Sequence, residues 1–210
     1  MKRYFITGTD TDCGKTYVTT KLLQAVPNSS AIKPVASGCI ELNHALVSSD
    51  AQQIQQHCNL SLDQINPWRF KAPASPHIAA REAGTNLSIS ELANYCLSFQ
   101  PSGIETLFIE GAGGLIVPLN EEETWIDFLI LTQIPVIIVV GMKLGCINHA
   151  LLTATALKAN AIQCAGWIAN CIDPNMAYLV ENTKTLVTKL QCPLLATINY
   201  DGGIFDLSLS

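Results

Sequence analysis

The sequence predicts an α/β fold in which helices cover both faces of an open, mostly parallel sheet. Short β-rich runs alternate with longer helical patterns along the 210 residues, and such alternation is typical of parallel sheets with right-handed crossovers. The run VIIVV at 136–140 is apolar at every position, as expected of a strand covered on both faces. With 49% hydrophobic residues and a mean hydropathy of +0.28, the chain can bury one sizeable core. We therefore expect a single domain over residues 1–210.

Four elements make up the first part of the chain. They are expected strands at 3–7 and 31–36 and expected helices at 15–26 and 50–58. Pro34 biases the preceding Lys33 toward extended geometry. Ser48 or Ser49 can act as a cap for the helix that begins with Asp50.

Eight further elements continue the alternation. They are expected helices at 89–99, 125–132, 148–160 and 175–190 and expected strands at 106–110, 136–140, 165–170 and 194–198. Ser88 and Glu91 have the spacing of a capping box. Asp173 followed by Pro174 places a cap before a proline at the first helical position.

The segments 37–49 and 59–84 are the least regular parts of the chain. Connections in α/β proteins are usually shorter, so these two long loops are candidates for covering a ligand. Ligands of such sheets bind at the carboxyl ends of the strands, and the motifs below are placed relative to that edge.

Charge, hydropathy and cysteine spacing exclude several classes of partner. The net charge is −5 and no Lys/Arg cluster is present, which argues against nucleic acid. The longest apolar run, near 135–140, is far too short to span a bilayer, and MKRYFIT at the N-terminus does not continue as a signal peptide. The eight cysteines are scattered without a C-x-x-C pair. We expect reduced structural thiols in a cytoplasmic protein, with no metal bound through them.

The stretch FITGTDTDCGKTYVTT at 5–20 follows an expected strand and opens an expected helix. It ends in G-K-T like a phosphate-binding loop, yet five residues rather than four separate Gly8 from Gly14. Backbone N–H groups at a helix N-terminus favour an anion, Lys15 adds a mobile cation, and Thr16 offers a hydroxyl to Mg²⁺. The alternative is a glycine-rich turn that carries G-K-T by chance, and the strand–turn–helix context argues against it. The pattern leaves open why such a loop holds two aspartates.

Charged residues also follow other expected strands. Lys33 in AIKPVASG would become a second cation for a transferring phosphoryl group if it points over the first loop. Glu110 ends the strand-like LFIE, and Asp50 begins a helix, so both carboxylates are candidate Mg²⁺ ligands. The alternatives are a solvated lysine, an acid in a strand-to-loop turn and an acid at a helix N-terminus.

Two later motifs offer further polar groups. In VVGMKLGCINHALLT a helix begins near Asn148, and its N-terminus is a second place for an anion such as a carboxylate. His149 has no acid nearby in the sequence, so we interpret it as structural. AGWIAN ends in Asn170, whose side chain either pairs with adenine or serves in a turn.

Seven motifs occur in a fixed order: TGTDTDCGKT, KPVASG, SD, SPHIAA, EGAGG, PVIIVVGMKLGCINHALLT and AGWIAN. Together they closely resemble the dethiobiotin synthetase family, from Phe5 to about Leu195. Single pieces are weak signals, but GTDTxxGKT combined with KPVxSG and KLGCINH is highly specific. Two positions depart from the family pattern, because Asp12 stands where glutamate is common and Asn199 where proline is frequent.

The resemblance implies a P-loop fold and an ATP-dependent ring closure that uses Mg²⁺. In that reaction 7,8-diaminopelargonate, CO₂ or bicarbonate, and ATP give dethiobiotin, ADP and phosphate. One amine forms a carbamate, the γ-phosphoryl group activates it as a mixed anhydride, and the neighbouring amine closes the cyclic urea. The resemblance also implies a homodimer whose substrate site lies near the interface.

The resemblance also assigns roles to individual residues. The implied catalytic residues are Lys33, Lys15 and Thr11. The implied nucleotide-binding residues are Asp12, Cys13, Gly14, Lys15, Thr16, Tyr17, Asp50, Glu110, Gly111, Ala112, Gly113, Asn170, Cys171, Asn199 and Tyr200. The implied substrate-binding residues are Thr11, Lys33 and Ser37, with Leu144, Gly145 and Asn148 from the facing subunit. The implied Mg²⁺ ligands are Thr16, Asp50 and Glu110.

Two other functions fit parts of the sequence. A nucleotide-switched protein of the partition ATPase and nitrogenase iron protein type often has a lysine four residues before the second glycine of the loop, where this chain has Asp10. An ATP-dependent amidotransferase usually carries an added glutamine-hydrolysing domain, for which 210 residues leave no room. A plain interaction module would not need charged residues at the ends of several strands.

Overall fold

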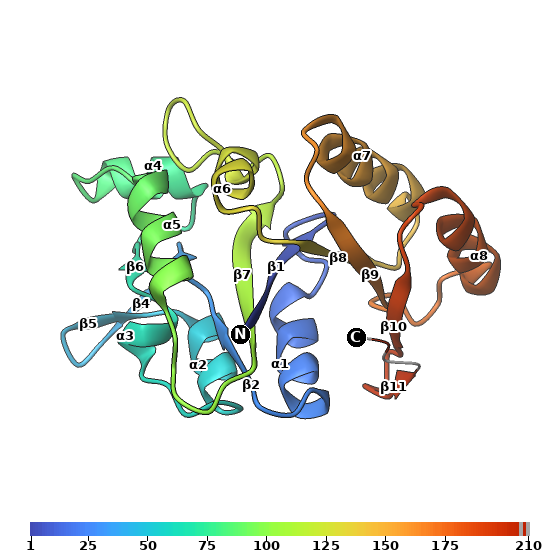
Figure 1. Cartoon of the computed structure of the whole chain (residues 1–210), viewed down its shortest axis with the longest axis horizontal. Coiled ribbons are helices and arrows are strands. Elements are labelled where there is room, and N and C mark those ends of the chain that lie inside the picture. The colour runs from blue at the N-terminus through green and yellow to red at the C-terminus, as the bar shows by residue number, and fades with distance from the viewer. Residues whose placement is uncertain (206–207, 209–210) are drawn as a thin grey trace.

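The computed structural model describes residues 1–205 and residue 208. At its centre is a seven-stranded sheet in the order β11-β10-β9-β8-β1-β7-β2 (Figure 1). The strands are β1 Lys2–Gly8, β2 Ser29–Ile32, β7 Thr106–Gly114, β8 Val136–Gly141, β9 Cys164–Asn170, β10 Leu194–Ile198 and β11 Ile204–Phe205. Neighbouring strands are parallel except for the antiparallel pair of β10 and β11. The predicted fold class is confirmed.

Helices cover both faces of this sheet. They are α1 Lys15–Ala25, α2 Ser49–Gln55, α5 Ile89–Ser98, α6 Trp125–Thr132, α7 Cys146–Ala159 and α8 Leu179–Lys189. In Figure 1, α1 and α2 lie below the sheet, whereas α6 and α7 lie above it. The strand order explains this division. The chain moves one way across the sheet from β1 to β2 and returns the other way through β7, β8, β9 and β10, so right-handed crossovers put the later helices on the opposite face.

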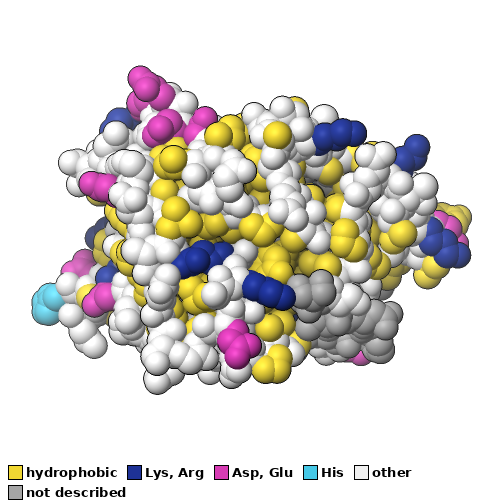
Figure 2. All heavy atoms as spheres, in the orientation of Figure 1, with side chains coloured by type: hydrophobic (Ala, Val, Ile, Leu, Met, Phe, Trp, Pro, Cys, Tyr) yellow, Lys and Arg dark blue, Asp and Glu magenta, His cyan; other side chains and the backbone are white. Residues whose placement is uncertain are grey.

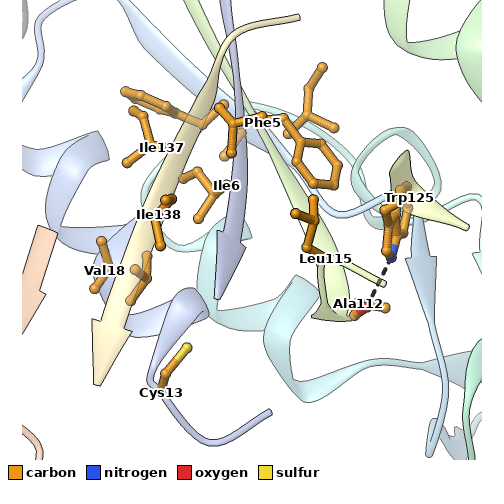
Figure 3. Packing of buried hydrophobic residues seen from close by; sticks show 14 of the residues in the cluster. Phe5, Ile6, Cys13, Val18, Ala112, Leu115, Trp125, Ile137 and Ile138 are labelled. Atoms are coloured by element: carbon orange, nitrogen blue, oxygen red, sulfur yellow. Dashed lines mark hydrogen bonds between the residues drawn. The ribbon is translucent and has the colours of Figure 1, made fainter. Parts of the chain in front are cut away.

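The core lies on both sides of the central strands. All six residues of β8 are buried, which confirms the interpretation of its apolar run. Phe5 on β1 packs against the rings of Trp125 and Phe128 in α6, with centroids 5.1 and 5.6 Å away. Because consecutive strand residues point to opposite faces, the next residue, Ile6, turns toward Val18 of α1 (Figure 3). The sheet is therefore held from both faces at the strand that leads into the glycine-rich loop.

The segments expected as long loops contain short elements of their own. In and around them lie β3 Val35–Ala36, β4 Ile40–Leu42, β5 Ala45–Val47, α3 Leu62–Ile65, β6 Trp68–Arg69 and α4 Pro76–Glu82. β4 and β5 form an antiparallel hairpin, and β3 pairs with β6 in a second small sheet. Strands of two or three residues and helices of one or two turns are too short to produce a recognisable sequence period.

The predicted strand at 31–36 is wrong as a single element. β2 ends at Ile32, and β3 belongs to the separate sheet with β6. Lys33 donates its backbone N–H to the carbonyl of Ile65 at 2.8 Å instead of continuing the ladder with β7, and Pro34 has no N–H to donate. The main sheet therefore stops one residue before Lys33, which lies at the carboxyl edge.

The predicted start of the last long helix is also wrong. α8 begins at Leu179 rather than at 175, after Tyr178 in the left-handed region with φ 58°. Asp173 does not cap this helix, because its carboxylate accepts the N–H of Asn175 at 2.9 Å within a local turn. α7 begins earlier than predicted, directly after Gly145 with φ 93°. In both places the residue directly before the helix has a positive φ. The spacing of apolar residues does not predict where such a residue lies.

Two predicted caps are present. Ser48 Oγ accepts the N–H of Ala51 at 3.4 Å, and Ser88 Oγ accepts the N–H of Glu91 at 3.3 Å. α2 nevertheless ends at Gln55, three residues before the predicted end. β7 continues to Gly114, four residues past its predicted end, because its glycine-rich end still pairs with β1.

Within residues 1–205 and residue 208, no helix has the length and apolar character needed to cross a membrane. On the face shown in Figure 2, Lys and Arg side chains are dispersed among acidic and uncharged ones and form no continuous stripe.

Candidate active site

The loop between β1 and α1 folds around a buried cysteine. Cys13 is fully buried (Figure 3), and a Cβ placed at Gly8 would lie 2.3 Å from its sulfur. Asn170, at the end of β9, donates its side-chain N–H to the carbonyl of Cys13 at 2.8 Å. Gly14 follows with φ 80°, a conformation that favours glycine. The loop thus accommodates its fifth intervening residue by burying the Cys13 side chain where Gly8 has none.

Lys15 turns back over the same loop. Its Nζ donates to the carbonyl oxygens of Asp10 at 3.1 Å and Thr11 at 3.4 Å, and the residue is only 5% exposed. The ammonium is therefore held above the backbone N–H groups that would receive a phosphate.

The first aspartate of the loop is neutralised by a distant lysine. Asp10 Oδ2 accepts from Lys143 Nζ at 2.7 Å, and its Oδ1 accepts from the backbone N–H of Thr11 at 2.7 Å. The hydrogen bond from Lys143, with that from Thr11, holds the pKa of Asp10 below its ordinary value. Asp10 therefore shapes the loop and joins it to the segment before α7, while Asp12 lines the neighbouring cavity.

An Asp10→Asn variant should lose at most about 1 kcal/mol of unfolding free energy near pH 7, because both Asp10 and Lys143 are more than a third exposed on their side chains. The folded-state pKa of Asp10 is lower than its usual 3.8, so its contribution is present above that pH and is lost as the pH falls. Urea unfolding of both proteins should show a difference that is constant from about pH 7 to about pH 5 and shrinks as the pH falls below about 4. A difference that grows on acidification would contradict the assignment.

Glu110 is the centre of a buried charge cluster at the carboxyl edge of the sheet. It is fully buried, and its Oε1 accepts from Thr16 Oγ1 at 2.6 Å and from Lys33 Nζ at 2.9 Å. Its Oε2 accepts from Thr19 Oγ1 at 2.7 Å. Lys33 also forms an ion pair with Asp50 of α2. Residues from β7, α1, α2 and the chain after β2 therefore converge at one point.

Lys33 stays charged in this cluster. Burial by itself lowers the pKa of the ammonium, but the carboxylates of Glu110 and Asp50 outweigh that effect and raise the pKa above its usual 10.5. The cluster thus presents a permanent cation beside the loop that holds Lys15.

Two cavities lie beside the cluster and share a wall. The first has a volume of 370 Å³, and its lining includes Asp12, Gly14, Lys15, Thr16, Tyr17, Lys33 and Asp50. The second has a volume of 440 Å³, and its lining includes Ser37, Ala112 and the segment 73–76. Thr11 and Gly113 line both cavities. A ligand in the first cavity would therefore contact the loop between β1 and α1. A second ligand in the second cavity would contact the segments that follow β2.

Several other residues named from the sequence lie behind this site. Gly111 packs on the core, since a Cβ there would lie 2.6 Å from the ring of Phe5. The carbonyl of Ala112 accepts the indole N–H of Trp125 at 2.9 Å (Figure 3). Cys171 donates its backbone N–H to Ile198 of β10 at 2.9 Å. These three positions chiefly fix the strand ends that carry the site.

The remaining nucleotide-binding candidates lie near the start of α1. Asn199 is half-buried and Tyr200 is exposed, in the turn that follows β10. A Cβ at Gly202 in that turn would lie 2.7 Å from the Tyr17 hydroxyl, so the turn lies against α1. Asn170 uses its side-chain N–H on the loop, a contact that the sequence interpretation did not include.

The three predicted substrate residues before and within α7 lie apart from the two cavities. Leu144 is 96% exposed, Gly145 precedes α7, and Asn148 is exposed in its first turn. Among the described residues, none of the three lines either cavity.

Three features of the site were not predicted. Thr19 lies one turn after Thr16 and Gln53 one turn after Asp50, so helical spacing could have indicated both. The pairing of Lys143 with Asp10 spans 133 positions, and nothing in the local sequence indicates it. The segment 73–76, by contrast, lies within 59–84, a region expected to cover a ligand, and it lines the second cavity.

The chain is similar to a family model and to named relatives. A family model described as AAA domain matches residues 2–204. The chain is 60% identical over 210 residues to ATP-dependent dethiobiotin synthetase BioD of Legionella pneumophila strain Paris, covering 100% of this chain and 99% of that protein. It is 43% identical over 203 residues to the protein of the same name from Cellvibrio japonicus, covering 94% and 89%.

Among solved structures, chloroplast FtsY from Physcomitrella patens aligns with a TM-score of 0.55 at 15% identity, covering 99% of this chain and 62% of that chain. At that identity the likeness shows the fold alone. The nucleotide-switch alternative is not favoured, because the full-length relatives carry the synthetase name. The chain belongs to the dethiobiotin synthetase family.

Proposed function

We propose that this chain is an ATP-dependent dethiobiotin synthetase that acts as a single domain over residues 1–210. The reaction joins 7,8-diaminopelargonate and CO₂ into a cyclic urea and releases ADP and phosphate. The observation that carries the proposal is the shared wall of the two cavities, beside which two lysines and a buried carboxylate gather. The full-length relatives at 60% identity support the same reaction. The eight free cysteines fit a reducing compartment such as the cytoplasm.

The chemical difficulty is to bring two anions together. One amine of the substrate takes up CO₂ as a carbamate, whose oxygen attacks the γ-phosphorus of ATP. ADP leaves, and the second amine attacks the resulting carbamic–phosphoric anhydride and expels phosphate. Lys15 binds phosphate oxygens and Lys33 binds both phosphate and carbamate oxygens, which offsets their repulsion and keeps them in line.

In this proposal ATP binds in the first cavity and extends toward the ends of β9 and β10. The loop from Asp12 to Tyr17 surrounds the phosphates, and Gly111–Gly113 lie along the nucleotide. Asn170, Cys171, Asn199 and Tyr200 form the adenine side of the site. The contact of the 199–203 turn with Tyr17 supports this arrangement, because it brings that turn to the start of α1.

Thr16, Asp50 and Glu110 are the proposed Mg²⁺ ligands. Their hydroxyl and carboxylate oxygens meet around Lys33, and Mg²⁺ prefers oxygen donors, with few carboxylates and with substrate phosphates. In the described part of the chain, no group of three or more His, Cys, Asp or Glu residues could hold a metal ion, so oxygens of ATP would complete the ligand set. When bound, Mg²⁺ would offset charge on the phosphates. The donor set fits the ion.

The second cavity holds the diamine in this proposal. Thr11 and Ser37 line it and can donate hydrogen bonds to the carbamate. The carboxylate tail of the substrate extends to Leu144, Gly145 and Asn148 of a second subunit in a homodimer. The 96% exposure of Leu144 supports this, because an exposed leucine beside a helix N-terminus suits contact with a partner.

An omission assay tests the proposed reaction. ATP turnover should require the diamine, bicarbonate and Mg²⁺ together, because phosphoryl transfer needs the carbamate as acceptor. The product is identified by mass as dethiobiotin, and ADP is measured in each mixture that lacks one component. Equal ATP turnover without the diamine would reject the synthetase and favour a switch ATPase.

A further inference from the structure

A third cavity lies at the opposite edge of the sheet, and the proposed function does not use it. Its volume is 520 Å³, and its lining combines Cys164 at the start of β9, Cys192 just before β10, and two basic residues, Lys158 and Lys189. The active-site loop follows the carboxyl end of β1, whereas these cysteines lie at the amino ends of parallel strands. The cavity is therefore separate from the ATP site.

The two cysteine sulfurs are in direct contact. Their Sγ atoms lie 3.1 Å apart, and both residues are half-buried. Cys164 also donates to the carbonyl of Gly166 at 3.5 Å, whereas Cys39 and Cys58 donate only to backbone carbonyls, those of Ala36 and Ile54. The register of β9 with β10 places Trp167 beside Leu194, so Cys164 at the start of β9 lies beside Cys192 in the segment that leads into β10. Neighbouring strands are about 4.8 Å apart, which is within the separation that a disulfide spans.

We propose that Cys164 and Cys192 form a reversible disulfide when a hydroperoxide oxidises the protein. The Cys192 thiolate attacks the terminal peroxide oxygen, which breaks the O–O bond, gives a sulfenic acid and expels hydroxide or alkoxide. That anion takes up the proton that the Cys192 thiol lost and leaves as water or an alcohol. The Cys164 sulfur then attacks the sulfenic sulfur, loses its proton and expels hydroxide, which takes up that proton to form water. Two thiols and one hydrogen peroxide give one disulfide and two waters, so the two electrons lost by the sulfurs reduce the peroxide.

The surroundings explain which sulfur reacts first. The hydrogen bond from Cys164 stabilises a thiolate at Cys192 and lowers the pKa of Cys192, whereas the same contact raises the pKa of Cys164. Lys158 and Lys189 line the same cavity, and the burial of Cys192 opposes the lowering of its pKa only in part. Formation of the disulfide also stops Cys192 at a reversible stage, before irreversible oxidation to the sulfinic acid.

Peptide mapping of the full chain tests the proposal. Reduced protein is treated with hydrogen peroxide, denatured in N-ethylmaleimide and digested. Wild type should lose two of its eight alkylatable thiols and yield a peptide that links Cys164 to Cys192, and dithiothreitol should restore both thiols. Cys164→Ser should leave Cys192 trapped as a sulfenic acid by dimedone. Cys58→Ser is the matched control, because Cys58 is also half-buried but its thiol donates to the carbonyl of Ile54 and not to another cysteine, and it should behave like wild type.

Three outcomes would overturn the proposal: no linked peptide, a disulfide between two chains, or equal thiol loss in a Cys164→Ser, Cys192→Ser double variant. These readouts do not measure turnover. Failure here would therefore leave the proposed synthetase reaction intact, and failure of the omission assay would leave the disulfide intact.

Discussion

A Lys33→Met variant should lose roughly 10²–10³-fold in kcat, the usual cost of removing one preorganised charge donor from a transferring oxyanion. Lys33 is 6% exposed and fixed between Glu110 and Asp50, so neither water nor a neighbouring side chain can replace it. Binding of ATP should weaken much less, because Lys15 and the loop backbone remain. Steady-state kinetics combined with ATP titration separates the two effects.

The matched control is Lys158→Met, which makes the same substitution at an exposed lysine far from the site. It should retain the kcat of wild type. Because Lys33→Met also leaves Glu110 without its cation, both variants are assayed at a temperature where circular dichroism shows them folded. Undiminished ring closure by folded Lys33→Met would remove Lys33 from the mechanism.

A Glu110→Gln variant should lose about 3–5 kcal/mol of unfolding free energy, the range found when one partner of a buried ion pair is removed. Glu110 is fully buried and accepts from Thr16, Thr19 and Lys33. An amide has no charge for Lys33 and offers only one acceptor oxygen. Urea unfolding in the absence of ligands measures the loss.

Asp50→Asn is the matched control for that measurement, because Asp50 pairs with the same Lys33 from a side chain that is 36% exposed. Solvent screens this pair, so its loss should cost about 1 kcal/mol or less. Equal costs for the two variants would show that burial of Glu110 does not determine the stability of the cluster.

Sequence patterns were sufficient for the parallel strands of the main sheet and most of its helices, but they did not predict β11. The expected helix at 125–132 and strand at 194–198 match α6 and β10 at both ends, because each is a regular apolar run between clear turn residues. The sequence was also sufficient to predict which parts of the chain meet at the site. Parallel strands bring their carboxyl ends to one edge, so residues after β1, β2 and β7 had to be near one another.

The features that were predicted wrongly or missed depend on tertiary contacts and backbone conformations that no local sequence pattern indicates. The strand predicted at 31–36 divides in two because the backbone N–H of Lys33 donates to the carbonyl of Ile65. This is a tertiary contact between residues far apart in the sequence. The start of α8 depends on the left-handed Tyr178. Lys143 pairs with Asp10 of the first loop across 133 positions, a contact that no local pattern indicates.

Because the two cavities meet at Thr11 and Gly113, the unstable carbamic–phosphoric anhydride of the proposed reaction would be formed next to the amine that consumes it. An acyl phosphate released into water would be hydrolysed, and the ATP that made it would be wasted. With one wall in common, the activated group is made within reach of the amine that consumes it, so no diffusion through solvent separates the two events. The shared wall therefore limits leakage of the intermediate by proximity.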